Sequence, residues 1–167
     1  KYRFAGLYRT MVIPLVRRRR SPNGRSASVE VRTATADDCH DILKFLELAG
    51  PARQLFPCYQ PPDLFGEGGA LRDLAPSDLL LAFRGVKLVG TLGGWDQHAF
   101  KQSVVERYAW NVRWSRPLYN LWSRLRGLPK LPPPGAAFRY LTGALPVVLD
   151  DEPGIFLALL NNLITRA

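Results

Sequence analysis

Two short apolar runs with a tight break between them occupy residues 78–97, and they constrain this fold more than any other stretch. The first run, residues 79–83, is long enough for a strand and too short for a stable helix. Gly85 stands in the break, as in a β-hairpin turn, and a second apolar run follows over residues 88–92. Because two adjacent apolar strands imply a sheet that is buried on at least one face, we expect this hairpin to form the centre of the fold.

Glycines occur inside or directly after the second run, at positions 90, 93 and 94. Glycine weakens a strand, because it has no side chain to pack and loses more conformational freedom than other residues. Three of them in one strand predict a bulge, or a close approach by another backbone or a ligand.

The segments on either side predict an α/β (α+β) chain. Residues 29–34 alternate as a half-buried strand does, and residues 39–48 carry a helical apolar face. The acids at its start are interpreted as complements of the helix dipole, with Thr35 or Asp37 as the cap. Residues 138–149 form a further strand candidate in which Pro146 demands a bulge or a local loss of pairing. A helix is expected over residues 155–164.

Length and composition suggest one domain, or one domain plus a piece. The chain has 167 residues, of which 47% are hydrophobic, so it can bury a real core. We expect residues 1–28 to be an N-terminal segment with a basic linker, and residues 29–167 to be the domain. Because the chain stops inside an apolar helical pattern, we interpret it as part of a longer protein, with residues 1–16 as the tail of an upstream module in a tandem arrangement.

Charge and cysteine content limit the partners. The net charge is +9 and the pI about 10.1, which favours nucleic acid, anionic lipid or phosphorylated small molecules; an ordinary basic enzyme is the alternative. Cys39 and Cys58 form no CxxC motif and only two histidines are present, so no metal site is expected. Two cysteines make no disulfide framework, which favours the reducing cytoplasm. No apolar run reaches the ~20 residues that a membrane span needs.

An insert over residues 98–137 is rich in tryptophan and arginine. Phe100, Val104 and Tyr108 recur every four residues and predict one helix. A second helix is expected from Ser115 to Gly127, with Pro117 in its first turn. This helix has an apolar tryptophan and leucine face that arginines surround.

The insert has four interpretations. It packs on the sheet with solvated arginines, lies on an anionic membrane surface, binds a protein partner or forms a homodimer, or stacks on single-stranded nucleic acid. Of these four, packing on the sheet is the arrangement that we expect, and binding to nucleic acid is the least expected.

Three stretches together resemble the GCN5-related N-acetyltransferase family. Residues 29–46, VEVRTATADDCHDILKFL, resemble the family's first strand and helix. Residues 79–95, LLLAFRGVKLVGTLGGW, resemble its second and third strands, and residues 138–167 its fourth strand with the following helix. The resemblance implies a partial, mixed and mostly antiparallel sheet flanked by helices, with the insert between the third and fourth strands.

The resemblance also implies an activity, which is transfer of an acetyl group from acetyl-CoA to an amine. In the family, amides of the fourth strand hold the pantetheine, and a glycine-rich loop at the next helix binds the pyrophosphate. The corresponding positions here are Val147, Val148, Leu149, Gly154, Ile155 and Phe156. This sequence departs from the loop, since Asp150, Asp151 and Glu152 bring negative charge and Pro153 removes an amide donor.

Candidate catalytic residues follow the third strand or lie in the fourth. His98 and Asp96 are candidates for proton transfer, and Tyr140 is a candidate that faces the groove. Each has a plain alternative as a surface or packing residue. The alternative function is a non-catalytic module that binds a protein partner or an anionic membrane surface through the insert.

Overall fold

The computed structural model describes residue 13, residues 29–53, residues 56–66 and residues 68–166. The expectations for residues 1–28, an upstream tail and a basic linker, therefore lie outside the described residues, apart from Ile13.

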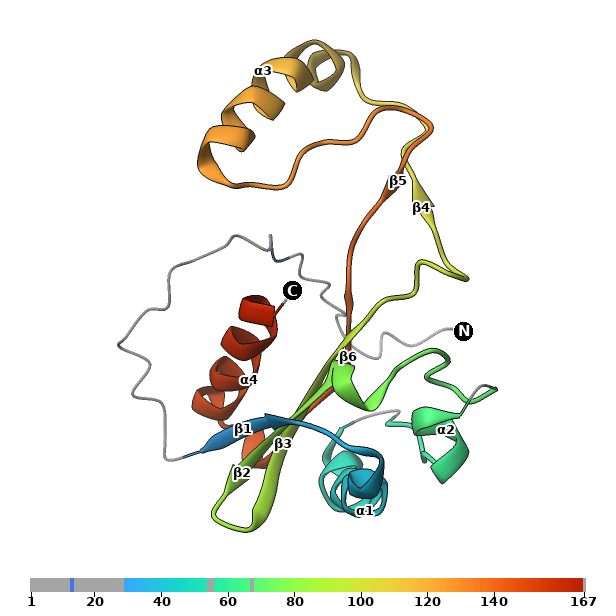
Figure 1. Ribbon diagram of the computed structural model, residues 1–167, viewed down its shortest axis with the longest axis vertical. Helices are drawn as coiled ribbons and strands as arrows, with labels where there is room; N and C mark the ends of the chain where they lie inside the picture. The colour runs from blue at the N-terminus through green and yellow to red at the C-terminus, as the bar shows by residue number, and fades with distance from the viewer. Residues whose placement is uncertain (1–12, 14–28, 54–55, 67, 167) are drawn as a thin grey trace, which may run out of the picture.

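A four-stranded antiparallel sheet forms the centre of the fold (Figure 1). Its strands, in spatial order, are β1 (Glu30–Thr33), β2 (Leu79–Arg84), β3 (Lys87–Trp95) and β6 (Thr142–Val148). The predicted hairpin is β2–β3, it turns at Gly85, and it occupies the middle of the sheet. The α+β class and the central place of the hairpin are confirmed.

Helices cover both faces of the sheet (Figure 1). The helices α1 (Cys39–Ala49) and α2 (Pro61–Phe65) lie on one face, and α4 (Pro153–Arg166) lies on the other. Side chains along β2 alternate between the two cores: Leu79 and Leu81 join the α1 side, and Leu80 joins the α4 side. Burial on both faces explains why β2 reads as a continuous apolar run rather than an alternating one.

The strand glycines allow α4 to approach the sheet closely. A Cβ atom at Gly90 would lie 2.9 Å from Cγ2 of Ile155, and one at Gly94 would lie 2.8 Å from Cδ1 of Leu163. The atoms that lie against these glycines belong to side chains of α4 rather than to another backbone or a ligand, which were the partners expected from the sequence.

The bulge that Pro146 demands is also present. The β3–β6 register shifts between Thr91 and Gly93, and Leu145 adopts a φ of 48°. The expected single strand over residues 138–149 is wrong in extent. It divides into the short β5 (Ala137–Phe138), which belongs to a separate two-stranded sheet, and β6 of the central sheet. Residues 139–141 lie between the two strands, so Tyr140 is outside the strand in which it was expected.

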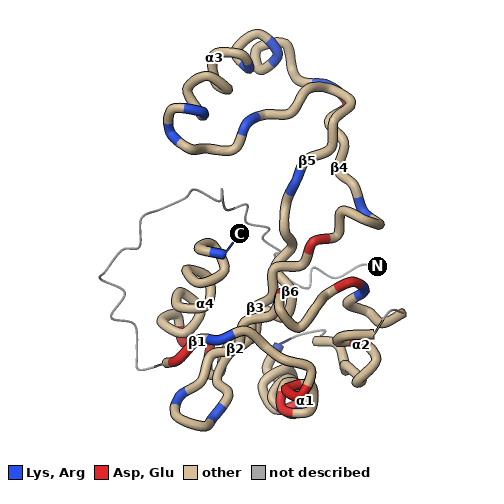
Figure 2. Tube along the Cα trace, viewed as in Figure 1, with Lys and Arg blue, Asp and Glu red and all other residues tan. Residues whose placement is uncertain are grey.

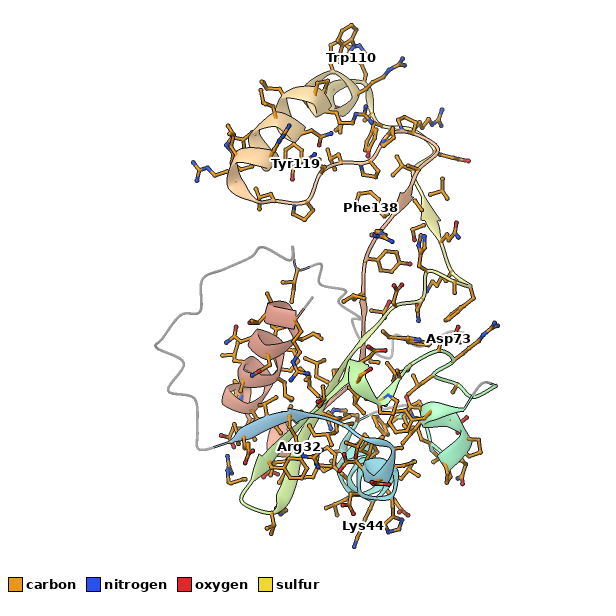
Figure 3. All side chains as sticks on the ribbon, viewed as in Figure 1. Arg32, Lys44, Asp73, Trp110, Tyr119 and Phe138 are labelled. Carbon is orange, nitrogen blue, oxygen red and sulfur yellow. The ribbon has the colours of Figure 1, made fainter. Side chains whose placement is uncertain are left out.

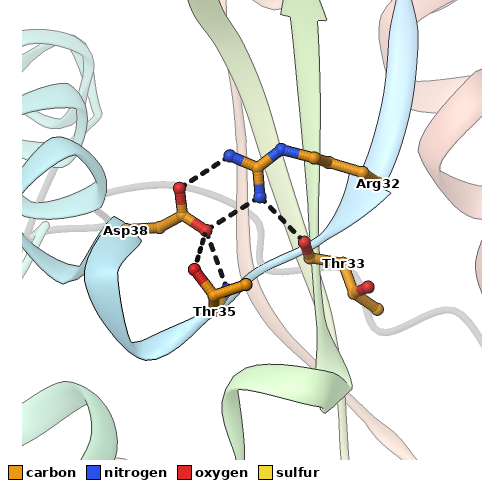
Figure 4. Close-up of polar contacts among 4 residues, drawn as sticks. All are labelled: Arg32, Thr33, Thr35 and Asp38. Carbon is orange, nitrogen blue, oxygen red and sulfur yellow. Dashed lines mark hydrogen bonds and ion pairs between the residues drawn. The ribbon is translucent and has the colours of Figure 1, made fainter.

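An ion pair joins β1 to the start of α1 (Figure 4). The guanidinium of Arg32 donates to both carboxylate oxygens of Asp38 at 2.8 and 2.6 Å, and the amide of Thr35 donates to Oδ2 at 2.8 Å. The hydrogen bonds from Arg32 hold the pKa of Asp38 well below its usual value. The interpretation of Asp38 as a dipole complement is thus incomplete, since its carboxylate is the partner of Arg32.

Residues 98–141 form an arm that leaves the sheet between β3 and β6 (Figure 1). The two-stranded pair of β4 (Ser103–Val104) and β5 forms its stem, and α3 (Trp110–Arg126) lies at its end, away from the sheet. The predicted place of a helical insert between the third and fourth strands of the sheet is confirmed, but it extends to residue 141 rather than 137. The interpretation that its helix packs on the sheet is wrong, because α3 stands off from it.

Two local predictions for the arm are corrected. No helix forms over residues 97–108, because Val105 pairs through both its backbone groups with Gly135 and Ala136 across the stem. The helix α3 begins at Trp110 rather than Ser115, and Pro117 lies inside it. Its predicted end is confirmed, since Gly127 adopts a left-handed φ of 66°.

Candidate functional site

The junction between β6 and α4 is the place where the resemblance puts cofactor binding. β6 ends at Val148, a 3-10 turn covers Leu149–Asp151, and α4 begins at Pro153. Asp150 and Asp151 both adopt a left-handed φ, of 54° and 50°. The first turn of a helix presents amide hydrogens and the positive end of the helix dipole, so this junction has the general electrostatics of an anion site.

Two arginines from distant parts of the chain converge on this junction. Arg53 pairs with Asp151 and also donates to the carbonyl oxygens of Ala49 and Val148, at 3.0 and 3.2 Å. Arg84 lies at the end of β2, and its Nη2 is 2.8 Å from Oε2 of Glu152. These pairs compensate two of the three carboxylates that the sequence brings to the turn.

Sequence reasoning missed both arginines. They are 98 and 68 residues away from their partners, and no local spacing relates them to the turn. Arg84 follows the apolar run of β2 directly, at the tip of the predicted hairpin, and that position was the only available signal.

The six candidate cofactor residues differ in what they can offer a ligand. The side chains of Val147, Val148 and Ile155 are buried in the two cores, so these residues can contact a ligand only through their backbone. The amide of Phe156 donates to the carbonyl of Glu152 at 3.3 Å, which engages it within the helix. Leu149 and Gly154 are half-buried at the turn itself.

β6 is the last strand of the sheet within the described residues. The outer edge of such a strand offers backbone donors and acceptors that an extended ligand can pair with. The bulge opposite Leu92 interrupts this edge near its middle.

The candidate catalytic residues lie at the opposite end of β6. Oδ1 of Asp96 accepts a hydrogen bond from the backbone amide of His98 at 2.9 Å, and the hydroxyl of Tyr140 is 3.1 Å from Oγ of Ser103. All belong to the base of the arm, beside the Trp95–Thr142 pair. From Thr142 to Val148 the strand rises by about 20 Å. The structure therefore separates these residues from the α4 junction by nearly the length of β6.

A cavity of about 810 Å³ lies beside Arg53, between α1 and the loop that follows it. Lys44, Glu47 and Tyr59 contribute to its lining. Burial, with a smaller contribution from the charge of Asp63, raises the pKa of Tyr59.

The groups at the junction fit the phosphates of acetyl-CoA under one condition. Guanidinium groups and a helix N-terminus are what proteins use to hold phosphate. The carboxylates of Asp151 and Glu152 occupy these guanidiniums, so a phosphate must displace them. The fit on the strand side needs no such exchange, because the edge of β6 is open within the described residues.

Lysine and arginine residues are concentrated on the arm (Figure 2). It carries eight Lys and Arg residues against a single acid, Glu106. None of the helices in the described part of the chain is long and apolar enough to cross a membrane. Among the described residues, no three His, Cys, Asp or Glu side chains are grouped as metal ligands would be.

Comparisons with known proteins returned no match. No family model matches the chain, and neither the curated proteins nor the solved structures contain a significant relative.

Proposed function

We propose that this chain is an N-acyltransferase of the GCN5-related type, which transfers an acetyl group from acetyl-CoA to an amine. The observation that carries the proposal is the convergence of Arg53 and Arg84 on the turn between β6 and α4. The resemblance in the sequence supports it, since the strand and helix that it assigns to cofactor binding are the ones that meet at this turn.

Each part of the junction has a role in this proposal. Arg53, Arg84 and the first turn of α4 hold the phosphates of acetyl-CoA, because guanidinium groups match phosphate oxygens in geometry and charge. The outer edge of β6 holds the extended thiol arm through backbone hydrogen bonds. When bound, acetyl-CoA supplies an acyl group activated as a thioester, and the chain positions a neutral amine to attack it. The bond between the carbonyl carbon and sulfur breaks, and coenzyme A leaves as a thiolate that takes up a proton.

We assign removal of the amine proton to the candidate catalytic residues at the base of the arm. Asp96, His98 and Tyr140 meet the acyl group if the ligand extends along β6 toward Thr142, which is the direction away from α4. A general base must lie within hydrogen-bond reach of the proton, directly or through one water.

Isothermal titration of acetyl-CoA into the chain tests the proposal. We expect binding by the unchanged chain and at least about tenfold weaker binding by the double variant R53M/R84M, because two charge-assisted contacts to phosphate are lost. The matched control is R72M, because Arg72 also pairs with an acid, Asp73, but lies away from the junction. Absence of binding by the unchanged chain, or equal loss in R72M, contradicts the proposal.

A second candidate function is a non-catalytic module that binds through the arm. The separation of the candidate catalytic residues from the α4 junction favours it, as do the carboxylates that occupy Arg53 and Arg84. The two functions differ in one measurement, since only the first requires acetyl-CoA to bind.

A further inference from the structure

The exposed face of α3 is apolar. Six large apolar side chains on one side of this helix are between 47% and 80% exposed: Trp110, Trp114, Leu118, Leu121, Trp122 and Leu125. Their spacing of three and four residues places them on one continuous stripe. A helix in a water-soluble domain normally turns such a stripe toward the core, and α3 turns it outward.

The opposite side of α3 is already occupied by the chain itself. The side-chain amide of Asn120 donates to the carbonyl of Leu131 at 3.0 Å and accepts from its amide at 2.8 Å. Arg116 donates to the carbonyl of Pro132 at 3.1 Å. Ser123 is fully buried on this side. The polar side of α3 therefore contacts residues 128–132, and the apolar stripe is the side that is left exposed.

The labelled side chains show the same division (Figure 3). Trp110 points away from the rest of the chain, whereas Tyr119 lies on the side of the returning segment. The hydroxyl of Tyr119 donates to the carbonyl of Pro129 at 3.4 Å. This arrangement fixes the rotation of α3 about its own axis and keeps the stripe pointing outward.

Arginines flank the stripe. Arg113 and Arg124 lie along one border and Arg126 along the other, and all three are exposed. Arg126 also stacks on Trp122, with its guanidinium carbon 5.6 Å from the ring centroid. A stripe of tryptophan and leucine with arginine at its borders matches the boundary between lipid headgroups and acyl chains.

We propose that α3 is an interfacial helix that binds the arm to a membrane surface containing anionic lipid. The leucines and tryptophans enter the boundary between headgroups and acyl chains, and the arginines contact the anionic headgroups. With 17 residues, α3 is about 25 Å long and lies in the plane of the surface. This inference is independent of acyl transfer, because it uses no residue of the junction between β6 and α4.

Charge decides between lipid and the other occupants of this face. A second copy would bring one strongly basic arm against another, and like charges at an interface oppose association. Nucleic acid would satisfy the arginines and stack on the three tryptophans, but it would leave the three leucines of the stripe exposed to water. An anionic bilayer satisfies the arginines and the leucines together.

Co-sedimentation with vesicles tests the inference. The full chain is mixed with vesicles of phosphatidylcholine alone or of phosphatidylcholine with phosphatidylserine. We expect binding to the anionic vesicles, with weaker binding at high salt because surface charges are screened. Emission from the tryptophans of α3 shifts to shorter wavelength on binding, and lipids brominated on their acyl chains quench it.

Variants connect the binding to this face. We expect W114S/L118S to bind anionic vesicles at least about tenfold more weakly, since two apolar side chains no longer enter the lipid. We expect R113Q/R124Q to lose about fivefold for each arginine. Because these side chains are exposed, the fold stays intact, which circular dichroism checks. The matched control is L48S, which removes an exposed leucine from α1 and leaves binding unchanged.

Four outcomes overturn the inference. The first two are an absence of binding to anionic vesicles, and binding by W114S/L118S that equals binding by the unchanged chain. The third is the formation of dimers that depend on Trp114, seen in sedimentation velocity, without vesicle binding. The fourth is binding of a single-stranded oligonucleotide in place of vesicles. Acetyl-CoA binding is measured on the same samples, so a failure of either proposal is visible without the other.

Discussion

Arg53 and Asp151 are 98 residues apart in the sequence and form an ion pair that ties the loop after α1 to the turn before α4. The side chain of Asp151 is 80% exposed, so the pair contributes little to the stability of the fold. In the proposed acetyl-CoA site, the pair matters because the carboxylate holds the guanidinium that a phosphate would need.

Removal of the competing carboxylate should strengthen acetyl-CoA binding. In D151N the turn loses a negative charge and Arg53 loses its ionic partner, so we expect the affinity to rise by about fivefold. Isothermal titration measures it, and D73N is the control because Asp73 pairs with an arginine elsewhere. Unchanged or weaker binding in D151N would show that Arg53 does not contact the ligand.

The pair of Arg32 and Asp38 should make stability depend on acidic pH. The guanidinium lowers the pKa of Asp38 in the folded chain, so its stabilisation is complete above the unfolded-state pKa near 4. It is lost as the pH falls from there toward the folded-state pKa. We expect D38N to lower the free energy of unfolding by about 1–2 kcal/mol at neutral pH.

Urea unfolding at neutral pH and near pH 3 checks this dependence. The difference between D38N and the unchanged chain should shrink at the lower pH, because Asp38 of the unfolded chain takes up a proton there while the folded chain keeps this carboxylate ionised. The neighbouring variant D37N, at an exposed carboxylate, should differ little from the unchanged chain at either pH. A difference for D38N that stays constant would rule out the ion pair as its cause.

Gly90 should resist substitution because α4 lies directly above it. In G90A the new methyl group meets Ile155 Cγ2 at 2.9 Å and Leu159 Cδ1 at 3.1 Å, so we expect a loss of about 1–3 kcal/mol. G143A is the control in β6, where the nearest atom is 4.0 Å away. Thermal unfolding that ranks G143A below G90A would contradict the packing described here.

Asn120 should hold the returning segment of the arm against α3. In N120A both hydrogen bonds to Leu131 are lost, so we expect faster hydrogen exchange at the Leu131 amide. Exchange in β2 and β3 should not change, because α3 does not pack on the sheet. N111A is the control, since among the described residues the Asn111 side chain accepts only from the adjacent Val112 amide. Protection at Leu131 that survives in N120A would remove the basis for the fixed rotation of α3.

The sheet could be predicted from the sequence because its signals are local. The apolar runs on either side of Gly85 predict the hairpin, and Pro146 predicts the bulge in β6. The helical periodicity of Phe100, Val104 and Tyr108 misled because cross-strand pairing in the stem decides the conformation there. A periodic pattern over a few residues carries no information about a strand-pairing partner that lies more than thirty residues away.

The candidate site was less predictable than the sheet. The three acids before α4 are visible in the sequence, but the arginines that compensate two of them come from other elements. The amphipathic pattern of α3 was also visible. Which way its apolar stripe faces depends on the hydrogen bonds of Asn120 with Leu131, and the sequence contains no signal for that pairing.

Amide chemical shifts measured during addition of acetyl-CoA test the proposed site most directly. We expect shifts to concentrate at the outer edge of β6 and at Gly154 and Ile155, with the arginine side-chain resonances of Arg53 and Arg84 moving as well. The amides of α3 should not move. An absence of shifts at the junction, or shifts confined to the arm, would contradict the assignment of acetyl-CoA to this site.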